Sequence, residues 1–168
     1  MPPEVYARMK TRTTILMLLW AFLVAGTAAA LPGRAGYDMT ADPDAQLKAA
    51  VQQAQKENKR ILMEVGGEWC IWCHKIDQFM KADPEIMSLL QKHYVLLKIN
   101  FSRENKNEKF LSRFPKVPGY PHMFLLEKDG KLIREQPTTD FESGQGYDKA
   151  KFIAFLKKWA PAPQAKAK

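Results

Sequence analysis

The sequence contains only two cysteines, Cys70 and Cys73, which lie within four consecutive positions. A scaffold held together by structural disulfides normally has several cysteines at wider spacings, so this class of protein is excluded. Closing so short a loop removes little conformational freedom from the unfolded chain, which makes the pair a poor covalent staple. We therefore expect the two thiols to serve a chemical purpose.

The chain also has no internal repeat, and its 168 residues suit one domain rather than two. Apolar residues make up 46% of the sequence, enough for a buried core, and the net charge is +8. A basic protein can bind nucleic acid, but these lysines are scattered and interleaved with acidic residues, which indicates a solvated surface. The charge pattern therefore predicts no nucleic-acid partner.

The first thirty residues differ in composition from the rest. Basic residues precede an apolar run from Ile15 to Ala25, and small residues occupy positions 27–30. This is the layout of a secretory signal peptide, so we predict export with cleavage after Ala30. The alternative is an uncleaved membrane anchor, because the apolar run is nearly long enough to span a bilayer. No cysteine follows the small residues, which argues against a lipoprotein anchor.

The remaining chain divides into a linker at 31–42 that is rich in Gly, Ala and Pro, a domain at 43–160 and a disordered tail at 161–168. The strand-helix-strand order at the start of the domain implies parallel pairing, and Asp129-Gly130 is a strong hairpin signal. Periodicity and turn signals predict helices at 43–57, from 70 with a restart at 84, at 107–113 and at the end near 159, and strands at 61–65, 94–99, 122–126 and 131–134.

The two cysteines follow a predicted strand directly and begin a predicted helix. A helix N-terminus presents unpaired amide donors and partial positive charge, which favour a thiolate at Cys70. Cys70 would attack a substrate disulfide, and Cys73, one helical turn later, would resolve the mixed disulfide. The reverse sequence of steps would oxidise a substrate dithiol. The spacing therefore suits a redox-active dithiol.

Residues 61–73 resemble the strand and active-site loop of the thioredoxin superfamily without a gap, and residues 117–121 are similar to its cis-proline loop. With the hairpin and the last amphipathic helix, the resemblance covers residues 43–159. It implies an α/β fold with a central mixed sheet of about four strands flanked by helices. It also implies an enzyme, a thiol-disulfide oxidoreductase without a cofactor or metal. Small envelope proteins with a Trp-Cys-x-x-Cys loop are similar in style, including the C-terminal domain of the electron-transferring Dsb membrane protein.

The resemblance also implies roles for individual residues. Glu64 falls where the superfamily has a buried acid, which would accept and return the proton of Cys73. Pro121 would be the cis-proline, shaping a backbone edge on which an extended substrate peptide can pair. Residues expected to contact substrate are Trp69, Trp72, Tyr120 and Pro121.

The resemblance to envelope proteins implies a periplasmic location for the exported chain. The expected substrates are protein thiols or disulfides, and the expected partner is a redox protein, for which a membrane protein is one candidate. Between the two directions of electron flow we favour reduction of substrate disulfides, although nothing in the sequence itself fixes the direction.

Three other readings of the cysteine pair remain open. Residues 70–74 satisfy the haem-attachment pattern of c-type cytochromes, with His74 as axial ligand, but a cytochrome requires neither Glu64 nor the Pro121 loop. A zinc site would have three clustered ligands and no evident fourth. A non-catalytic binding module or chaperone on the same fold would need neither cysteine. These arguments favour thiol-disulfide exchange.

Overall fold

The computed structural model describes residues 36–163. The predicted signal peptide and the predicted cleavage after Ala30 lie outside these residues, as do positions 31–35 of the linker and 164–168 of the tail. Within residues 36–163, none of the helices combines the length and the apolar character that crossing a membrane requires.

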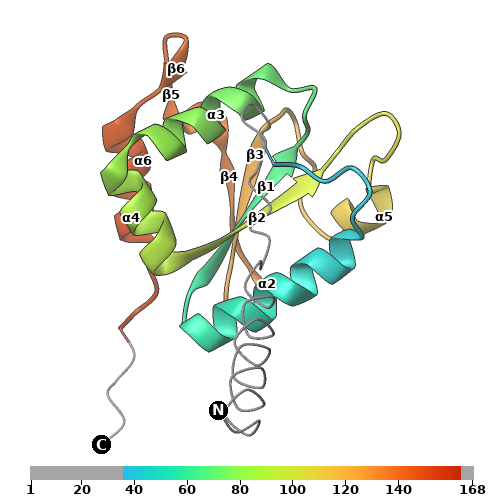
Figure 1. Cartoon of the computed structure of the whole chain (residues 1–168), viewed down its shortest axis with the longest axis horizontal. Helices are drawn as coiled ribbons and strands as arrows, with labels where there is room; N and C mark the ends of the chain where they lie inside the picture. Colours follow the sequence, from blue (N-terminus) through green and yellow to red (C-terminus); the bar gives the residue numbers. More distant parts are fainter. Residues whose placement is uncertain (1–35, 164–168) are drawn as a thin grey trace, which may run out of the picture. The chain divides into compact units, whose positions relative to one another are not determined.

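A four-stranded sheet in the order β2-β1-β3-β4 forms the centre of the domain (Figure 1). β1 pairs in parallel with β2 and antiparallel with β3, and β3 pairs antiparallel with β4. The strands are β1 (Arg60–Gly66), β2 (Tyr94–Asn100), β3 (His122–Leu126) and β4 (Leu132–Pro137). The predicted mixed sheet of four strands with flanking helices is therefore confirmed.

Helices cover both faces of this sheet, with α3, α4 and α6 on one side and α2 and α5 on the other (Figure 1). They are α2 (Pro43–Glu57), α3 (Ile71–Ala82), α4 (Pro84–His93), α5 (Glu108–Leu111) and α6 (Lys149–Lys158). Asp83 separates α3 from α4: its side chain accepts from the Glu85 and Ile86 amides, and Pro84 opens α4. The restart that Asp83-Pro84 predicts is thus present.

Alternation along β1 divides the core into two layers. Ile61, Met63 and Val65 pack against α2 and α5, whereas Leu62 packs against α3, α4 and α6. By the same alternation Glu64 lies on the face of α3, the helix that carries the cysteines. Every residue of β1 after Arg60 is buried, so the Glu64 carboxyl faces α3 from inside the core.

The polar, Gly-containing stretch at about 137–146, for which the sequence predicts a loop, holds regular structure. It contains a 3₁₀ turn, η1 (Thr138–Phe141), and a small hairpin of β5 (Glu142–Ser143) and β6 (Gly146–Tyr147). Gly144 has φ +59°, the left-handed conformation that glycine adopts readily. Strands of two residues are too short to show alternation, so the sequence pattern does not reveal them.

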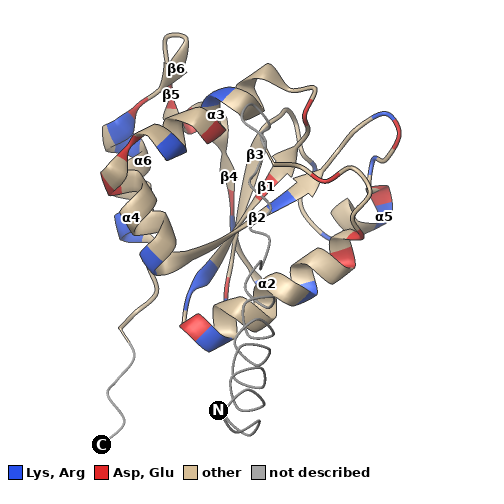
Figure 2. Cartoon of the chain, viewed as in Figure 1, with Lys and Arg blue, Asp and Glu red and all other residues tan. Residues whose placement is uncertain are grey.

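Acidic and basic side chains are interspersed over most of the helices and loops (Figure 2). The exception is α6, whose charged residues are all lysines. Several surface ion pairs link segments that are distant in the sequence, as between Lys149 and Asp83 at 2.7 Å. The surroundings of the thiol pair differ from this surface, because several of the charged side chains there are buried.

Candidate active site

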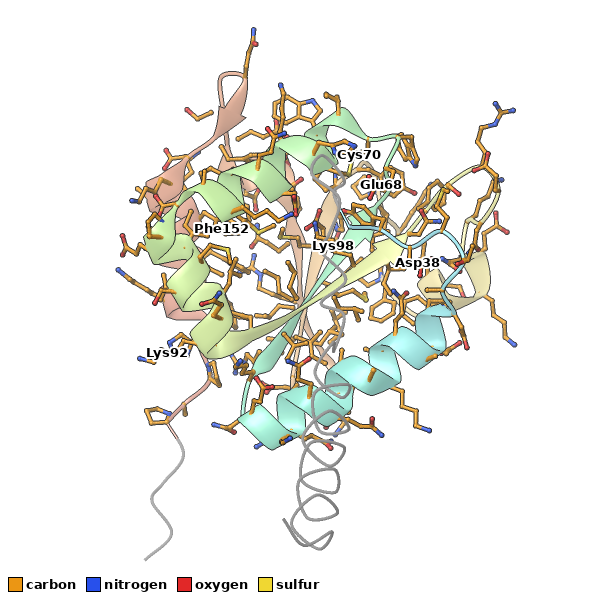
Figure 3. The ribbon with its side chains drawn as sticks, viewed as in Figure 1. Asp38, Glu68, Cys70, Lys92, Lys98 and Phe152 are labelled. Carbon is orange, nitrogen blue, oxygen red and sulfur yellow. A yellow bond between two sulfur atoms is a disulfide. The ribbon has the colours of Figure 1, made fainter. Side chains whose placement is uncertain are left out.

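Cys70 and Cys73 form a disulfide where β1 ends and α3 begins, with their Cα atoms 5.2 Å apart. Cys70 is the N-cap of α3: its Sγ accepts a hydrogen bond of 3.1 Å from the Cys73 amide. Figure 3 labels Cys70 at this helix end. Cys70 is 4% exposed and Cys73 is fully buried. Cys70 is therefore the sulfur that an incoming partner reaches first.

Glu64 lies on β1, the strand that leads into the cysteine loop, and is fully buried. Its Oε1 accepts a hydrogen bond of 2.5 Å from the Tyr37 hydroxyl, whereas Oε2 has no hydrogen-bond partner among the described residues. Burial raises the pKa of Glu64 above its ordinary value, against the opposing effects of the Lys98 charge and the Tyr37 hydrogen bond. The predicted acid is thus placed where its affinity for a proton is increased.

A buried ion pair lies in the same layer. Asp77, one helical turn after Cys73, is 6% exposed, and its Oδ1 lies 2.7 Å from Lys98 Nζ. Lys98 stands opposite Glu64 in the parallel register of β1 and β2. Sequence analysis did not identify this pair, although Asp77 falls on the apolar face of its helix and Lys98 interrupts an apolar strand. Those two positions are the signal that could have revealed it.

Tyr37 is the other site residue that sequence analysis missed, since it falls in the predicted linker. The structure places it 3% exposed and packed against Cys70 and Cys73. Its backbone is held by Glu68 Oε1, which accepts from the Gly36 amide at 2.8 Å and the Tyr37 amide at 2.9 Å. Figure 3 labels Glu68 beside Cys70. Burial, reinforced by the neighbouring Glu64 carboxylate, raises the pKa of the Tyr37 phenol well above its ordinary value.

Gly66, the last residue of β1, lets these groups approach one another. A Cβ atom built on Gly66 would lie 2.5 Å from Cys73 Sγ and 2.6 Å from the Tyr37 hydroxyl. Side chains essentially never pack this closely, so any larger residue would displace the sulfur or the phenol. Because Gly66 has no side chain, the Tyr37 hydroxyl and Cys73 Sγ can both occupy the space beside it.

An aromatic rim lies on one side of the disulfide, made by Trp69, Phe101 and Tyr120. The Trp69 Nε1 donates to the Phe101 carbonyl at 2.6 Å, and the Trp69 ring meets the Tyr120 ring edge-on at 5.5 Å between centroids. Tyr120 in turn stacks on Phe101 at 4.7 Å. Trp69 remains 58% exposed, so this rim presents an accessible apolar surface next to Cys70.

The peptide bond between Tyr120 and Pro121 is cis. Pro121 is buried, and its carbonyl accepts from the Thr138 hydroxyl at 2.6 Å, which attaches the loop to η1. Trp72 lies apart from the aromatic rim: its ring meets Tyr147 of β6 edge-on at 5.7 Å, while Lys75 Nζ lies 4.2 Å from its centroid. The structure thus brings Trp69 and Tyr120 together and holds Trp72 against the small hairpin.

His74, the axial ligand of the haem alternative, turns back onto the loop before the helix. Its Nε2 lies 2.8 Å from the Glu68 carbonyl oxygen. The ring therefore helps to close the loop that carries Glu68 and Trp69.

Comparison with known proteins gives one family and several relatives. The family model described as thioredoxin-like matches residues 42–128. The chain is 27% identical over 128 residues to the thiol:disulfide interchange protein DsbD of Pseudomonas fluorescens, covering 76% of this chain and 20% of the relative. It is 24% identical over 106 residues to the disulfide bond reductase DsbH of Chlamydia pneumoniae, covering 58% of this chain and 61% of the relative.

Among solved structures, a disulphide isomerase from Xylella fastidiosa superposes with a TM-score of 0.60 at 25% identity. The match covers 78% of this chain and 98% of that one. The chain thus corresponds to nearly the whole of this solved structure but spans only about a fifth of the DsbD relative and three fifths of the DsbH relative. The resemblance predicted from residues 61–73 and 117–121 is confirmed.

Proposed function

Because the chain belongs to the thioredoxin-like family, we propose that it is a thiol-disulfide oxidoreductase of the bacterial envelope that reduces disulfides in protein substrates. The observation that carries this proposal is the Cys70–Cys73 pair at the N-terminus of α3, packed against Tyr37, whose hydroxyl bonds the buried Glu64. Two relatives support the reaction class by their names, a thiol:disulfide interchange protein and a disulfide bond reductase.

The reaction begins with the pair reduced. The amide groups at the start of α3 and the partial positive charge of the helix end stabilise a thiolate on Cys70. This thiolate attacks a substrate disulfide and forms a mixed disulfide. Cys73 then loses its proton, attacks Cys70 and releases the reduced substrate, so that the pair ends as the disulfide of the structure.

Glu64 is the group proposed to hold the proton that Cys73 loses. Its raised pKa brings its proton affinity closer to that of a thiol, which makes transfer between the two groups efficient. The carboxyl is fully buried, so the proton does not exchange freely with solvent during the step. When the disulfide is reduced again, the same carboxyl returns the proton.

Substrate is proposed to bind along the rim. Trp69 is 58% exposed and Ile71 is 66% exposed, so apolar side chains flank Cys70 on both sides in the sequence. Tyr120 and the backbone beside Pro121 extend this surface, and Trp72, like Tyr120, packs against the cluster that contains the two cysteines. Such a surface suits an extended segment of a protein substrate that pairs through its backbone and rests apolar side chains on the rim.

The location and partner extend the same proposal. The predicted signal peptide supports export to the periplasm, where the oxidised pair would need a fresh supply of electrons. A redox protein that exchanges disulfides with Cys70, either soluble or in the membrane, would supply them.

The test is a trapping experiment with Cys73→Ser. Without the resolving thiol, mixed disulfides between Cys70 and its partners accumulate and survive non-reducing electrophoresis. The matched control is Cys70→Ser, which keeps Cys73 but removes the attacking thiol and should trap nothing. Absence of trapped partners with Cys73→Ser in envelope extracts would overturn the proposed activity.

Direction is tested separately by equilibrating the Cys70–Cys73 couple with glutathione. A reductase of this fold has a reduction potential around −270 mV, whereas a strong oxidant lies around −120 mV. We expect a value at the reducing end. A potential near that of the oxidants would keep the thiol-disulfide chemistry but reverse the proposed direction.

A further inference from the structure

We propose that Tyr37 relays the proton between Cys73 and Glu64, and that Glu68 holds it in place for this purpose. The inference rests on the proposed function, because it concerns the step in which Cys73 resolves the mixed disulfide. Tyr37 precedes the segment 42–128 that matches the family model, and it lies in the part of the chain expected to be a linker. Neither the family match nor the cysteine motif assigns it a role.

The first argument is position. The Tyr37 hydroxyl donates to Glu64 Oε1 at 2.5 Å. The same hydroxyl and Cys73 Sγ both lie within 2.6 Å of the point that a Cβ atom on Gly66 would occupy. The hydroxyl thus touches the carboxyl on one side and lies close to the sulfur on the other. A group in this position can accept a proton from the thiol while it donates its own to the acid.

The second argument is burial. Tyr37 is 3% exposed, and both Cys73 and Glu64 are fully buried. Proton transfer from a buried thiol directly to bulk solvent is slow in such a site, so an internal acceptor and a path to it are needed. Within residues 36–163, the Tyr37 hydroxyl donates to Glu64 Oε1, and Oε2 has no hydrogen-bond partner. The path to the carboxyl therefore runs through Tyr37.

The third argument is the way the backbone of Tyr37 is held. Consecutive amides, those of Gly36 and Tyr37, both donate to Glu68 Oε1. Gly36 has φ +87°, a conformation that glycine adopts without strain and that lets successive N–H groups converge on one anion. Glu68 belongs to the active-site loop, two residues before Cys70. The loop that carries the thiols thereby fixes the residue that serves them.

The proposed step balances as follows. In the mixed disulfide, Cys70 Sγ is bonded to a substrate sulfur. The Cys73 thiol passes its proton to the Tyr37 oxygen as the Tyr37 hydroxyl passes its own proton to the Glu64 carboxylate, so Tyr37 ends neutral. The Cys73 sulfur uses its electron pair to bond Cys70, and the bond from Cys70 to the substrate breaks. That electron pair leaves on the substrate sulfur, which is reduced as the cysteine pair is oxidised.

The experiment uses Tyr37→Phe in the full chain, with Tyr94→Phe as the matched control. Tyr94 is also buried, at 4% exposed, and its hydroxyl donates to the Leu156 carbonyl at 2.8 Å. It pairs with Arg60, at the end of β1 opposite to Gly66 and the cysteines. The reduced protein is mixed with insulin, and release of the substrate thiol from the mixed disulfide is followed by rapid quenching over a range of pH. This isolates the resolving step from the initial attack.

We expect Tyr37→Phe to slow resolution at least about tenfold near neutral pH, since positioned proton transfer contributes roughly 10²-fold or more. The rate should recover as the pH rises past the ordinary thiol pKa of about 8.5, where Cys73 ionises without a relay. Tyr94→Phe should match the wild-type profile. A profile for Tyr37→Phe that equals the wild type, or a loss that is the same at every pH, would overturn the relay.

Two further variants keep the test decisive if Tyr37→Phe folds poorly. Glu68→Ala removes the acceptor of both amides but retains the phenol, and should show the same loss confined to neutral pH. Glu68→Gln retains an acceptor oxygen and should lose less.

A double variant tests whether Tyr37 and Glu64 act in the same step. Tyr37→Phe combined with Glu64→Gln should resolve the mixed disulfide no more slowly than Glu64→Gln alone, because both substitutions interrupt the same proton transfer. Additive losses would overturn the relay.

The outcome also separates this inference from the proposed function. If the wild type forms no mixed disulfide with insulin and Cys73→Ser traps no envelope protein, the oxidoreductase proposal fails and the relay fails with it. If the wild type resolves mixed disulfides normally and Tyr37→Phe has an unchanged pH profile, only the relay fails.

Discussion

Lys98 Nζ lies 2.7 Å from Asp77 Oδ1, and the side chains of both residues are at most 10% exposed. The other carboxylate oxygen, Oδ2, lies 2.6 Å from Lys81 Nζ, whose side chain is 59% exposed. One buried carboxylate thus has a buried cation on one side and a solvated cation on the other. Because Lys98 also lowers and Asp77 also raises the pKa of Glu64, the pair connects stability to the chemistry of the site.

Replacing the two lysines should therefore have unequal effects. Lys98→Met removes the buried cation beside the Asp77 carboxylate. Breaking a buried ion pair in this way should lower the unfolding free energy by about 3 kcal/mol. Lys81→Met removes an exposed partner and should cost less than about 1 kcal/mol. Urea unfolding of the oxidised protein at neutral pH measures both. Equal costs would mean that the burial of Lys98 does not matter.

Much of the fold follows from local sequence. Asp42-Pro43 and Asp83-Pro84 define helix starts whose caps are present in the structure, and the apolar run at 61–65 becomes the buried core of β1. The β5–β6 hairpin was not predicted, because each of its strands has only two residues. Its position depends on tertiary packing, since Phe141, immediately before β5, meets Phe152 of α6 edge-on at 5.0 Å.

The site divides in the same way. Cys70, Cys73 and Glu64 lie within ten residues of each other, so one strand and one helix start are enough to bring them together. Tyr37 comes from a segment without periodicity, and it reaches the thiols through long-range contacts. Glu68, 31 positions away, accepts from its amide, and Glu64, 27 positions away, accepts from its hydroxyl. Partnerships of this kind depend on how distant segments meet, which no pattern in a single segment encodes.

Glu64 should make stability decrease as the pH rises. Its pKa is raised in the folded state above the ordinary 4.5, so between these two values the folded protein holds a proton that the unfolded chain has lost. The contribution of Glu64 is therefore fully present below about pH 4.5 and is lost as the pH rises through the folded pKa. Glu64→Gln should remove this dependence and raise the unfolding free energy at neutral pH.

The check is urea unfolding of wild type and Glu64→Gln from pH 4 to 8. The difference between the two proteins is the quantity to follow, because burial lowers the pKa of His93 and His122, which gives both proteins an opposite slope at mildly acidic pH. We expect the gap in favour of Glu64→Gln to widen with pH. A gap that stays constant would show that Glu64 titrates alike in both states.

Gly66→Ala should disturb the site more than it disturbs the fold. The new methyl group would meet Cys73 Sγ at 2.5 Å and the Tyr37 hydroxyl at 2.6 Å, so one of them must move. Overpacking of this kind costs about 1–3 kcal/mol, and displacement of Tyr37 should also slow the resolving step. Gly146→Ala is the matched control, since nothing lies within 4 Å of its Cβ position. Unfolding curves and single-turnover rates of both variants decide the matter.

Trp69→Ala should separate protein substrates from small ones. The indole N–H bond to the Phe101 carbonyl and the edge contact with Tyr120 hold Trp69 on the rim, yet the ring is 58% exposed and contributes little to the core. Its loss removes apolar contact with a protein substrate but leaves the thiols unchanged. Loss of about 1.4 kcal/mol of such contact lowers kcat/KM for insulin about tenfold, while kcat/KM for hydroxyethyl disulfide should hardly change.

The ratio of these two constants is the informative quantity, because a general loss of folded protein lowers both equally. Trp159→Ala provides the comparison: Trp159 follows α6, and its carbonyl accepts from Arg60, which opens β1 at the end opposite to Gly66. This variant should keep the wild-type ratio even if it is less stable. If Trp69→Ala also keeps that ratio, the rim does not bind protein substrates, and the apolar surface beside Cys70 has another purpose.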